Sequence, residues 1–301
     1  EKWLSFAPDN RTIAYASERD GNWNIYTAKI AREEEVNFPN ATLIEEEAIL
    51  PASTKERFAP QFSPDGKELA FIEDRTKLMV VDLKTKKVRQ VVDDKYQYHT
   101  GDGFTYTWSP DGKWFAMEII GNRHDPYSDI AIVSADGKGE VVNLTNSGYF
   151  DSNPRWVLEG NAILFSSERY GMRNHASWGS LQDVMIVFMN QDAYDKFRLN
   201  KEDYELLKEE EKRIASLKNK EQKEDQKDKK GETKLAVKEK KNIEVELKGI
   251  EDRVMRLTPN SSQLGDAILS KSGDKLYYMA SFEGGMDLWV SDLRSRSTKV
   301  M

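Results

Sequence analysis

A short turn flanked by apolar residues recurs along this chain of 301 residues. Its clearest copy is Trp108-Ser109-Pro110-Asp111-Gly112-Lys113, followed by the apolar run Trp114–Met117. Pro110 sets φ for a turn, the Asp111 side chain can accept hydrogen bonds from the turn backbone, and Gly112 tolerates the positive φ that closes the turn. Aromatic and aliphatic residues on both sides favour buried strands. One copy alone predicts a β-hairpin.

The same pattern occurs at four other places, with some turn residues replaced. The turn residues are Pro8 and Asp9 in the first copy (with Asn10 in place of glycine), Pro64, Asp65 and Gly66 in the second, Pro110, Asp111 and Gly112 in the third, Gly160 in the fourth, and Gly273 in a weaker fifth. Counted from 8 to 64, 64 to 110, 110 to 158 and 158 to 271, the steps are 56, 46, 48 and 113 residues. A four-stranded propeller blade takes about 40–50 residues, so the last step indicates one blade with a large insertion. We therefore expect an all-β fold over residues 1–301, a β-propeller of four-stranded blades.

The insertion is expected at residues 190–242, between the third and fourth strands of the fourth blade. Apolar residues between Tyr194 and Leu217 recur with the spacing of an amphipathic helix. The tract Lys218–Lys241 mixes lysine with acidic residues and has too few apolar side chains to offset the entropy of ordering it. The sequence therefore predicts a charged helical insertion that is partly disordered. Order should resume with an alternating strand at Ile243–Leu247, followed by the outer strand Val254–Leu257.

Composition excludes several classes of partner and site. The net charge of −7 and the pI near 5.3 argue against nucleic acid as a partner. Cysteine is absent, which removes disulfides, thiolate nucleophiles and cysteine-based metal sites and fits either the cytoplasm or a bacterial envelope compartment. No apolar run approaches the roughly 18–20 residues of a membrane-spanning helix. Because the chain begins at Glu1 rather than methionine, we expect a trimmed or excerpted piece.

A search for catalytic, cofactor and metal motifs predicts none of these sites. The chain has no Gly-x-Ser-x-Gly nucleophile elbow, no phosphate-binding Gly-x-x-x-x-Gly-Lys-Ser/Thr loop and no His-Glu-x-x-His helix. The histidines His99, His124 and His175 lie far apart on predicted loops and are expected to pack there, although a propeller can bring distant loops together on one face. The acidic groups Asp93-Asp94 and Glu45–Glu47 are expected to be solvated charges rather than acid–base catalysts.

Two further sets of residues allow a structural and a functional interpretation. A polar residue precedes or begins the third strand of several blades, and we expect these residues to cap turns, with a ligand-binding ring as the alternative; they are Asn24, Asp129, Asp183 and Asp287. Several tryptophans fall on predicted strands and are expected in the core rather than on a platform for carbohydrate or peptide; they are Trp108, Trp114, Trp156 and Trp289.

The repeated Phe/Trp-Ser-Pro-Asp-Gly-Lys pattern resembles the TolB-like (PD40) class of propeller repeats. TolB, the propellers of prolyl-oligopeptidase-type and dipeptidyl-peptidase-type enzymes, and tricorn-type proteases share such repeats. Three further features are similar to tricorn-like serine peptidases of the S41 type, most of all the N-terminal propeller of those from Bacteroides-type bacteria. They are the segment Gly148–Trp156, the blade-ending segment Gly249–Leu257, and the long charged insertion after Asp183-Val184.

This resemblance implies a parent protein in which propeller modules accompany a PDZ domain and a C-terminal serine-protease domain. No catalytic part of that family can be matched here, so the expected function is a non-catalytic module that recognises or gates peptide or protein substrates. A stand-alone TolB-like scaffold that binds another envelope protein is the alternative, and an active hydrolase is a third interpretation that lacks a nucleophile. The resemblance implies a periplasmic or envelope location, with the cytoplasm as the alternative. Propellers of the family commonly have six or seven blades, so five visible repeats leave ring closure open.

Overall fold

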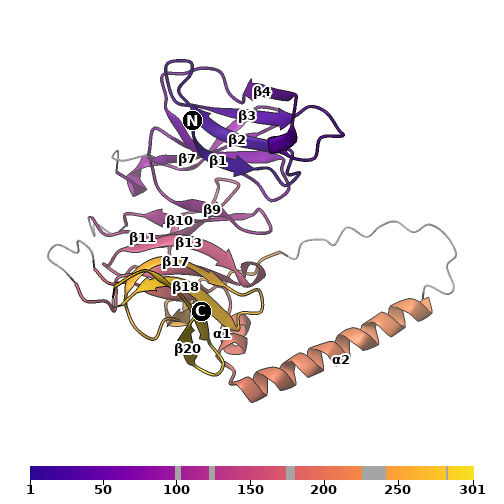
Figure 1. Cartoon of the computed structure of the whole chain (residues 1–301), viewed down its shortest axis with the longest axis vertical. Coiled ribbons are helices and arrows are strands. Elements are labelled where there is room, and N and C mark those ends of the chain that lie inside the picture. Colours follow the sequence, from indigo (N-terminus) through magenta and orange to yellow (C-terminus); the bar gives the residue numbers. More distant parts are fainter. Residues whose placement is uncertain (99–102, 122–125, 174–179, 226–241, 283) are drawn as a thin grey trace.

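The structure is a computed structural model that describes residues 1–98, 103–121, 126–173, 180–225, 242–282 and 284–301. Within these residues the chain forms five four-stranded antiparallel sheets, one after another (Figure 1). Each sheet is a meander in which consecutive strands are neighbours. The predicted all-β propeller architecture of five four-stranded repeats with a helical insertion is therefore confirmed.

The five sheets are numbered here as blades one to five. Blade one contains β1 (Lys2–Phe6), β2 (Thr12–Ser17), β3 (Asn24–Ile30) and β4 (Ile44–Ala48), and blade two contains β5 (Arg57–Phe62), β6 (Glu68–Glu73), β7 (Lys77–Asp82) and β8 (Val88–Val92). Blade three contains β9 (Tyr106–Trp108), β10 (Trp114–Ile119), β11 (Asp129–Ser134) and β12 (Val142–Asn143), and blade four contains β13 (Asp151–Val157), β14 (Ala162–Ser167), β15 (Asp183–Phe188) and β16 (Val254–Arg256). Blade five contains β17 (Gln263–Leu269), β18 (Lys275–Ser281), β19 (Asp287–Asp292) and β20 (Ser297–Val300).

The core consists of apolar layers between consecutive blades. The second strands of blades two, three and four are buried almost throughout, because each of these sheets has a neighbour on both faces. Four apolar clusters fill the successive junctions, and their fully buried members include Leu69 and Phe71 between blades one and two, Phe58 and Phe115 between two and three, Ile130 and Ile163 between three and four, and Phe188 and Leu276 between four and five.

The tryptophans that the sequence placed in the core do pack there. Trp108 is buried in the cluster between blades two and three, and its ring lies 4.1 Å from that of Phe115. Trp114 and Trp156 pack against the next cluster, and Trp289 packs against the last. The core interpretation is therefore correct for these four residues.

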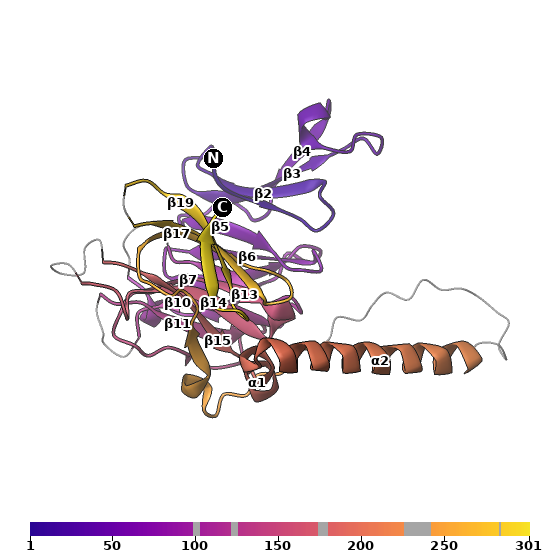
Figure 2. The same ribbon diagram turned by 60° about the horizontal axis from the view of Figure 1, so that its bottom comes forward.

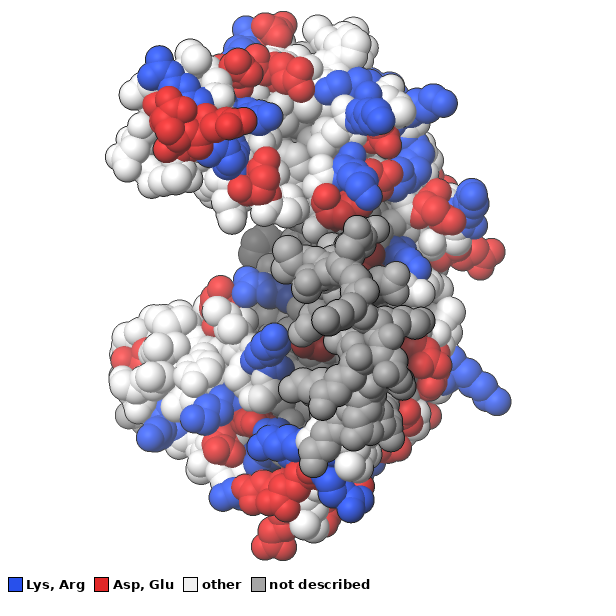
Figure 3. Space-filling model, turned by 90° about the vertical axis from the view of Figure 1, so that its right-hand side faces the viewer, with Lys and Arg blue, Asp and Glu red and all other residues white. Residues whose placement is uncertain are grey.

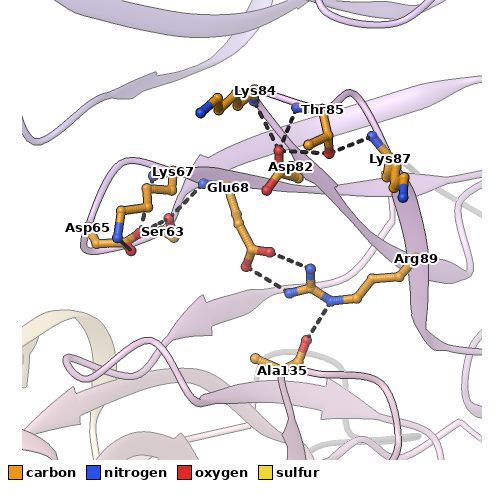
Figure 4. A network of polar contacts seen from close by, with 10 residues as sticks. All are labelled: Ser63, Asp65, Lys67, Glu68, Asp82, Lys84, Thr85, Lys87, Arg89 and Ala135. Carbon is orange, nitrogen blue, oxygen red and sulfur yellow. Dashed lines mark hydrogen bonds and ion pairs between the residues drawn. The ribbon is translucent and has the colours of Figure 1, made fainter.

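A polar contact adds to the apolar one between blades two and three. The Arg89 guanidinium, on the outer strand of blade two, pairs with the carboxylate of Glu68 (Figure 4). Its Nε donates to the carbonyl of Ala135 in blade three at 3.0 Å. Because Glu68 fixes the direction of the guanidinium, the remaining donor is aimed at the neighbouring blade.

The insertion contains two helices, α1 (Gln191–Arg198) and α2 (Lys201–Asp225), rather than the single helix expected up to Leu217. Asn190 caps α1 by accepting from the Ala193 amide at 2.9 Å, and Asn200 caps α2 by accepting from the Asp203 amide at 2.9 Å. Each asparagine starts a new helix, because its side chain satisfies an amide that has no partner inside the helix. Partial disorder was predicted for Lys218–Lys241: residues 218–225 of this tract belong to α2, and residues 226–241 lie outside the described part of the chain.

Among the described side chains of α2, those that bond the propeller lie near the start of the helix. The Tyr204 hydroxyl donates to the carbonyl of Ser272 at 3.0 Å, and Lys208 pairs with Asp274 at 3.3 Å, both in the turn of blade five. Leu206 is exposed between these two residues of α2, Ile214 and Leu217 are exposed further along, and the helix projects away from the sheets (Figure 2). The apolar spacing that predicted a packed amphipathic helix is thus not matched by a partner surface within the described residues.

The predicted strand at Ile243–Leu247 is wrong, although the chain is extended there. The segment forms no ladder. Its carbonyl groups are instead bonded by Arg253, a buried guanidinium that donates to the carbonyls of Glu246 and Lys248 and to that of Phe188 at the end of β15. A side chain thus takes the place of a neighbouring strand. The outer strand follows at β16, within the predicted Val254–Leu257.

The first and last blades stand at opposite ends of the row of blades (Figure 1). The face in Figure 3 is hollowed between them. Both end blades carry exposed apolar side chains, such as Leu4 and Phe6 in blade one and Ile268 and Leu288 in blade five. In the described part of the chain, no buried apolar cluster joins blade five to blade one. The five blades therefore form an open arc.

Candidate functional site

The repeated turns lie at one end of the blades, and their aspartates bond the turn backbone. Asp9 accepts from the amides of Arg11 and Thr12 at 2.8 and 2.9 Å. In the second and third copies Asp65 and Asp111 each accept from the serine two residues earlier, at 2.7 and 2.6 Å. Asp9 and Asp65 are used within their turns, as Figure 4 shows for Asp65, whereas Asp111 also accepts from the amide of Ile243, after the insertion, at 2.9 Å.

The turn glycines also pack on the preceding blade. A Cβ on Gly66 would lie 3.3 Å from Pro8, one on Gly112 would lie 3.6 Å from Pro64, and one on Gly160 would lie 3.5 Å from Pro110. A Cβ on Gly273 would lie 3.0 Å from Leu158, the residue that stands in place of proline in the fourth copy of the turn. Each turn therefore rests on the one before it. Glycine at this position leaves room for the proline in addition to accepting positive φ, between +72° and +95° in these four turns.

The opposite end of the blades carries the buried polar residues that begin the third strands. Asn24, Asp129 and Asp183 are at most 4% exposed, whereas Asp287 in blade five is exposed. The expected turn-capping role is wrong for the three buried residues. Their side chains bond the segment that leaves the outer strand of the same blade: Asn24 donates to the Leu50 carbonyl at 2.9 Å, and Asp129 accepts from Asn143 and from the Ser147 amide, both at 2.8 Å. Asp183 accepts from Thr258 and Ser261 at 2.6 and 2.7 Å.

A cavity of about 290 Å³ lies at this end, between blades three and four. Its wall includes Asp151, which is 1% exposed, and the apolar side chains of Phe165 and Met185. Arg169 and Glu251, both exposed, contribute to its lining. Burial raises the pKa of Asp151, and the nearby charge of Asp129 adds to the rise, while neighbouring hydroxyls oppose it.

A second cavity, of about 220 Å³, lies on the other face of the blade-four sheet, next to blade five. The inner strands β13 and β17 both contribute to it, through Asn153 and Arg155 on one and Gly265 and Asp266 on the other. Arg155 and Asp266 form an ion pair at 2.8 Å. Both strands have a register shift at this point, between Ser152 and Arg155 and between Leu264 and Ala267. Such bulges change the direction of side chains and are often found near functional sites.

Within the described part of the chain, the remaining acidic candidates do not assemble into a metal site. The histidines His99, His124 and His175 lie outside the described residues. Glu45–Glu47 lie on the exposed strand β4, and Asp93 caps a short 3₁₀ helix through the Lys95 amide. Among the residues that the structure describes, no group of three or more histidine, aspartate or glutamate side chains is placed to hold a metal ion.

Sequence reasoning missed both cavities. Each is formed by residues from several strands of two blades, so no single local pattern indicates a cavity. Two signals were available for the 290 Å³ cavity: the asparagine or aspartate that begins the third strand marks its end of the blades, and the segments Gly148–Trp156 and Gly249–Leu257 contribute Asp151, Glu251 and Val254 to its lining.

Comparison with known proteins agrees with the propeller assignment. Residues 44–175 match the family model described as the TolB β-propeller domain. Over 108 residues the chain is 29% identical to a tricorn-like protease C-terminal subunit of Sulfurisphaera tokodaii, and over 115 residues it is 30% identical to the peptidase YuxL of Bacillus subtilis. These matches cover 36% and 35% of this chain but only 12% and 16% of the two relatives, so the chain represents a small part of their length.

Solved structures show the same fold over nearly the whole chain. The tricorn protease superimposes with a TM-score of 0.61 at 11% identity, covering 99% of this chain and 26% of its own. A puromycin-hydrolysing peptidase of Mycobacterium tuberculosis gives a TM-score of 0.55 at 12% identity, covering all of this chain and 37% of its own. TolB of Acinetobacter baumannii gives 0.50 at 19% identity, covering 99% and 53%. No helix among the described residues is long and apolar enough to cross a membrane. Residues 44–175 thus match the TolB β-propeller domain, and the chain as a whole has a fold similar to that of the tricorn protease, a peptidase and TolB.

Proposed function

We propose that this propeller is the non-catalytic module of a tricorn-like serine peptidase, in which it recognises or gates peptide or protein substrates. The observation that carries the proposal is the pair of cavities on the two faces of blade four, of about 290 and 220 Å³, in a chain whose described residues form no catalytic or metal cluster. The relatives named as peptidases supply the context. On this proposal the neighbouring domains are a PDZ domain and a protease domain, and the location is the periplasm or cell envelope.

The inner strands suit the binding of an extended peptide. β13 and β17 each have one edge without a neighbour in their own sheets, and an added strand can pair with such an edge. Part of the β13 edge is already bonded, since the amides of Asp151 and Asn153 donate to the Ser128 carbonyl and the Glu118 carboxylate, so an added strand would use the backbone groups that remain. The polar pair Arg155 and Asp266 lies beside this edge and is about half exposed, which leaves it able to contact a bound backbone. An unfolded segment passing along the hollow of the arc would therefore meet backbone and side-chain partners together.

Site-specific photo-crosslinking in the full-length protein tests the proposal. A photoreactive residue replaces Arg155 beside the second cavity or, as the matched control, Val88 on the exposed outer strand of blade two. An unfolded model substrate should crosslink at position 155 and not at 88. Equal labelling at the two positions, or an unchanged substrate range after deletion of the propeller, would refute recognition or gating by this module.

A TolB-like scaffold that binds another envelope protein is the second candidate. The match of residues 44–175 to the TolB propeller model favours it. The two proposals differ in the size of the natural product, since the chain alone has a mass of 34.6 kDa. An intact mass several-fold higher, with the protease activity on the same polypeptide, supports the peptidase module; a mass near 34.6 kDa supports the scaffold.

A further inference from the structure

The repeat allows a comparison of the same position at two blade junctions. Arg57 begins β5 and lies opposite Glu73, the last residue of β6. Asp151 begins β13 and lies opposite Ser167, the last residue of β14. In both inner strands a register shift follows directly, and in both the third strand of the preceding blade begins with a buried polar residue, Asn24 or Asp129. Arg57 and Asp151 therefore occupy equivalent positions with opposite charge.

Between blades one and two this position is occupied by a cation that the chain supplies itself. The guanidinium of Arg57 is buried, and it donates to the side chain of Asn24 and to the carbonyl of Pro51, both at 2.9 Å. Its Nε lies 3.7 Å from the carboxylate of Glu73, which also pairs with Lys55 at 2.6 Å. The buried acid at this junction thus has two cationic neighbours, as a buried charge requires.

Between blades three and four the same position has two acids and no such cation. Ser147 connects the two carboxylates, since its amide donates to Asp129 and its hydroxyl donates to Asp151, both at 2.8 Å. The other carboxylate oxygen of Asp151, Oδ1, is buried without a hydrogen-bond partner among the described residues. No lysine or arginine in that part of the chain forms an ion pair with either acid, and Arg169, which contributes to the lining of the same cavity, is exposed.

The junction between blades four and five provides a second comparison. Asp183 is the equivalent of Asp129, and it is 0% exposed. Here the chain again supplies the cation, because Arg256 donates to Asp183 from Nε at 2.8 Å. All three junctions contain a buried acid. At the junction between blades three and four, the described residues provide no cationic partner for it. The larger of the two cavities lies at this same junction.

The cavity has the chemistry and the size for a cationic side chain. One water molecule takes up about 30 Å³ of liquid, so a cavity of about 290 Å³ admits a group much larger than one water. Phe165 and Met185 provide apolar walls for a methylene stem, while Asp151 and the hydroxyl of Ser167 provide acceptors for its charged end. Two buried carboxylates disfavour an anion.

We propose that this cavity, with Asp151 in its wall, binds the lysine or arginine side chain of a peptide or protein. The ammonium or guanidinium group takes the place that Arg57 holds at the junction between blades one and two, and it donates to Oδ1 of Asp151. The inference rests on the proposed function and deepens it, because it names a basic residue as the element that the propeller selects. A hydrogen bond between charged groups also fixes the position of the bound chain relative to blade four.

The test compares matched peptides on the full-length protein by calorimetry. Acetyl-Ala-Lys-Ala-amide is compared with its norleucine counterpart, which keeps the stem and lacks the charge, and an arginine peptide is compared with its citrulline counterpart. The lysine and arginine peptides should bind about 10- to 100-fold more tightly, the range of one charge-assisted hydrogen bond. Asp151→Asn should remove this preference. Asp136→Asn, an equal charge change in an exposed turn of blade three, should keep it.

Three outcomes separate the inference from the function on which it rests. Charge-selective binding that Asp151→Asn abolishes supports both. Binding of all four peptides with equal affinity overturns the cation site and leaves peptide recognition standing. Failure of every peptide to bind, at concentrations where a model unfolded substrate also fails, overturns both. If Asp151→Asn does not fold, the comparison of lysine with norleucine in the wild-type protein decides by itself.

Discussion

Asp183 is the residue that should matter most for holding the two halves of blade four together. It begins β15, and all its side-chain partners lie beyond the insertion, at the end of the outer strand β16 and after it. The carboxylate accepts from Arg256 at 2.8 Å, from Thr258 at 2.6 Å and from Ser261 at 2.7 Å. The chain between donor and acceptor is 73 to 78 residues long, so these bonds close a long loop.

The cost of Asp183→Asn follows from these three bonds. Asparagine keeps one acceptor oxygen, but its NH2 group replaces the other and faces the hydroxyl of Thr258 or Ser261. The negative charge that strengthens the hydrogen bond from Arg256 is also lost. A neutral hydrogen bond contributes about 1 kcal/mol and one to a charged group about 1.5–3 kcal/mol, so we expect a loss of about 2 kcal/mol. Asp183→Ala removes the carboxylate that pairs with Arg256, and we expect the free energy of unfolding to fall by about 3 kcal/mol. This loss is at the lower end of the range for breaking a buried ion pair, because the Arg256 side chain is 31% exposed.

Urea unfolding followed by tryptophan fluorescence measures these losses, and hydrogen exchange of residues 254–262 locates them. Asp136→Asn serves as the control, since it changes the same charge in an exposed turn. A double-mutant cycle with Arg256→Gln isolates the ion pair. The reasoning is refuted if Asp183→Asn costs less than about 0.5 kcal/mol and leaves the exchange of β16 unchanged.

Three further predictions concern the turns, the core and acid stability. Gly112 has a φ of +73°, so Gly112→Ala should cost about 1–2 kcal/mol in chemical denaturation, whereas Gly285→Ala, with nothing within 4 Å of its Cβ, should be close to neutral. Phe115 is fully buried against Trp108, so Phe115→Ala should cost about 3–5 kcal/mol, and a thermal shift below the equivalent of 1 kcal/mol would contradict the packing. Hydrogen bonds from Tyr15 and then Arg19 hold the pKa of Glu46 below 4.5, so its contribution to stability is present above pH 4.5 and is lost as the pH falls through the lowered value. Glu46→Gln should therefore flatten the stability profile below pH 4.5 in urea titrations, and an unaltered profile would show that Glu46 is not its source.

The number and type of the blades could be predicted from the sequence because each blade repeats a local signal. Proline, aspartate and glycine at fixed offsets define the turn at Asp65 or Asp111 without reference to the rest of the chain. The packing of Gly112 on Pro64 was not predicted, since it depends on how one blade stacks on the next. The break between α1 and α2 was predictable in principle: Asn200 stands three residues before an acidic residue, as a helix cap does.

The candidate sites were not predictable from local patterns. The alternation at Ile243–Leu247 indicates a strand, but Arg253 occupies the carbonyls that a neighbouring strand would use. Asp151 lies in the family-like segment Gly148–Trp156, but that segment does not single it out, and its importance depends on the residue at the equivalent place of another blade, Arg57. That equivalence is defined by strand register, which becomes visible when the inner strands are aligned on their bulges.

The open arc has a thermodynamic consequence. Four apolar layers in series join five blades, so each blade is stabilised by its neighbours, and the end blades have one such layer where the inner blades have two. Unless something covers the free faces of blades one and five, stability becomes a sum of nearest-neighbour terms, as in linear repeat proteins. Unfolding would then begin at Leu4 and Phe6 or at Ile268 and Leu288 and proceed inward, and any surface that seats on either end would stabilise the whole row in proportion to the area it buries.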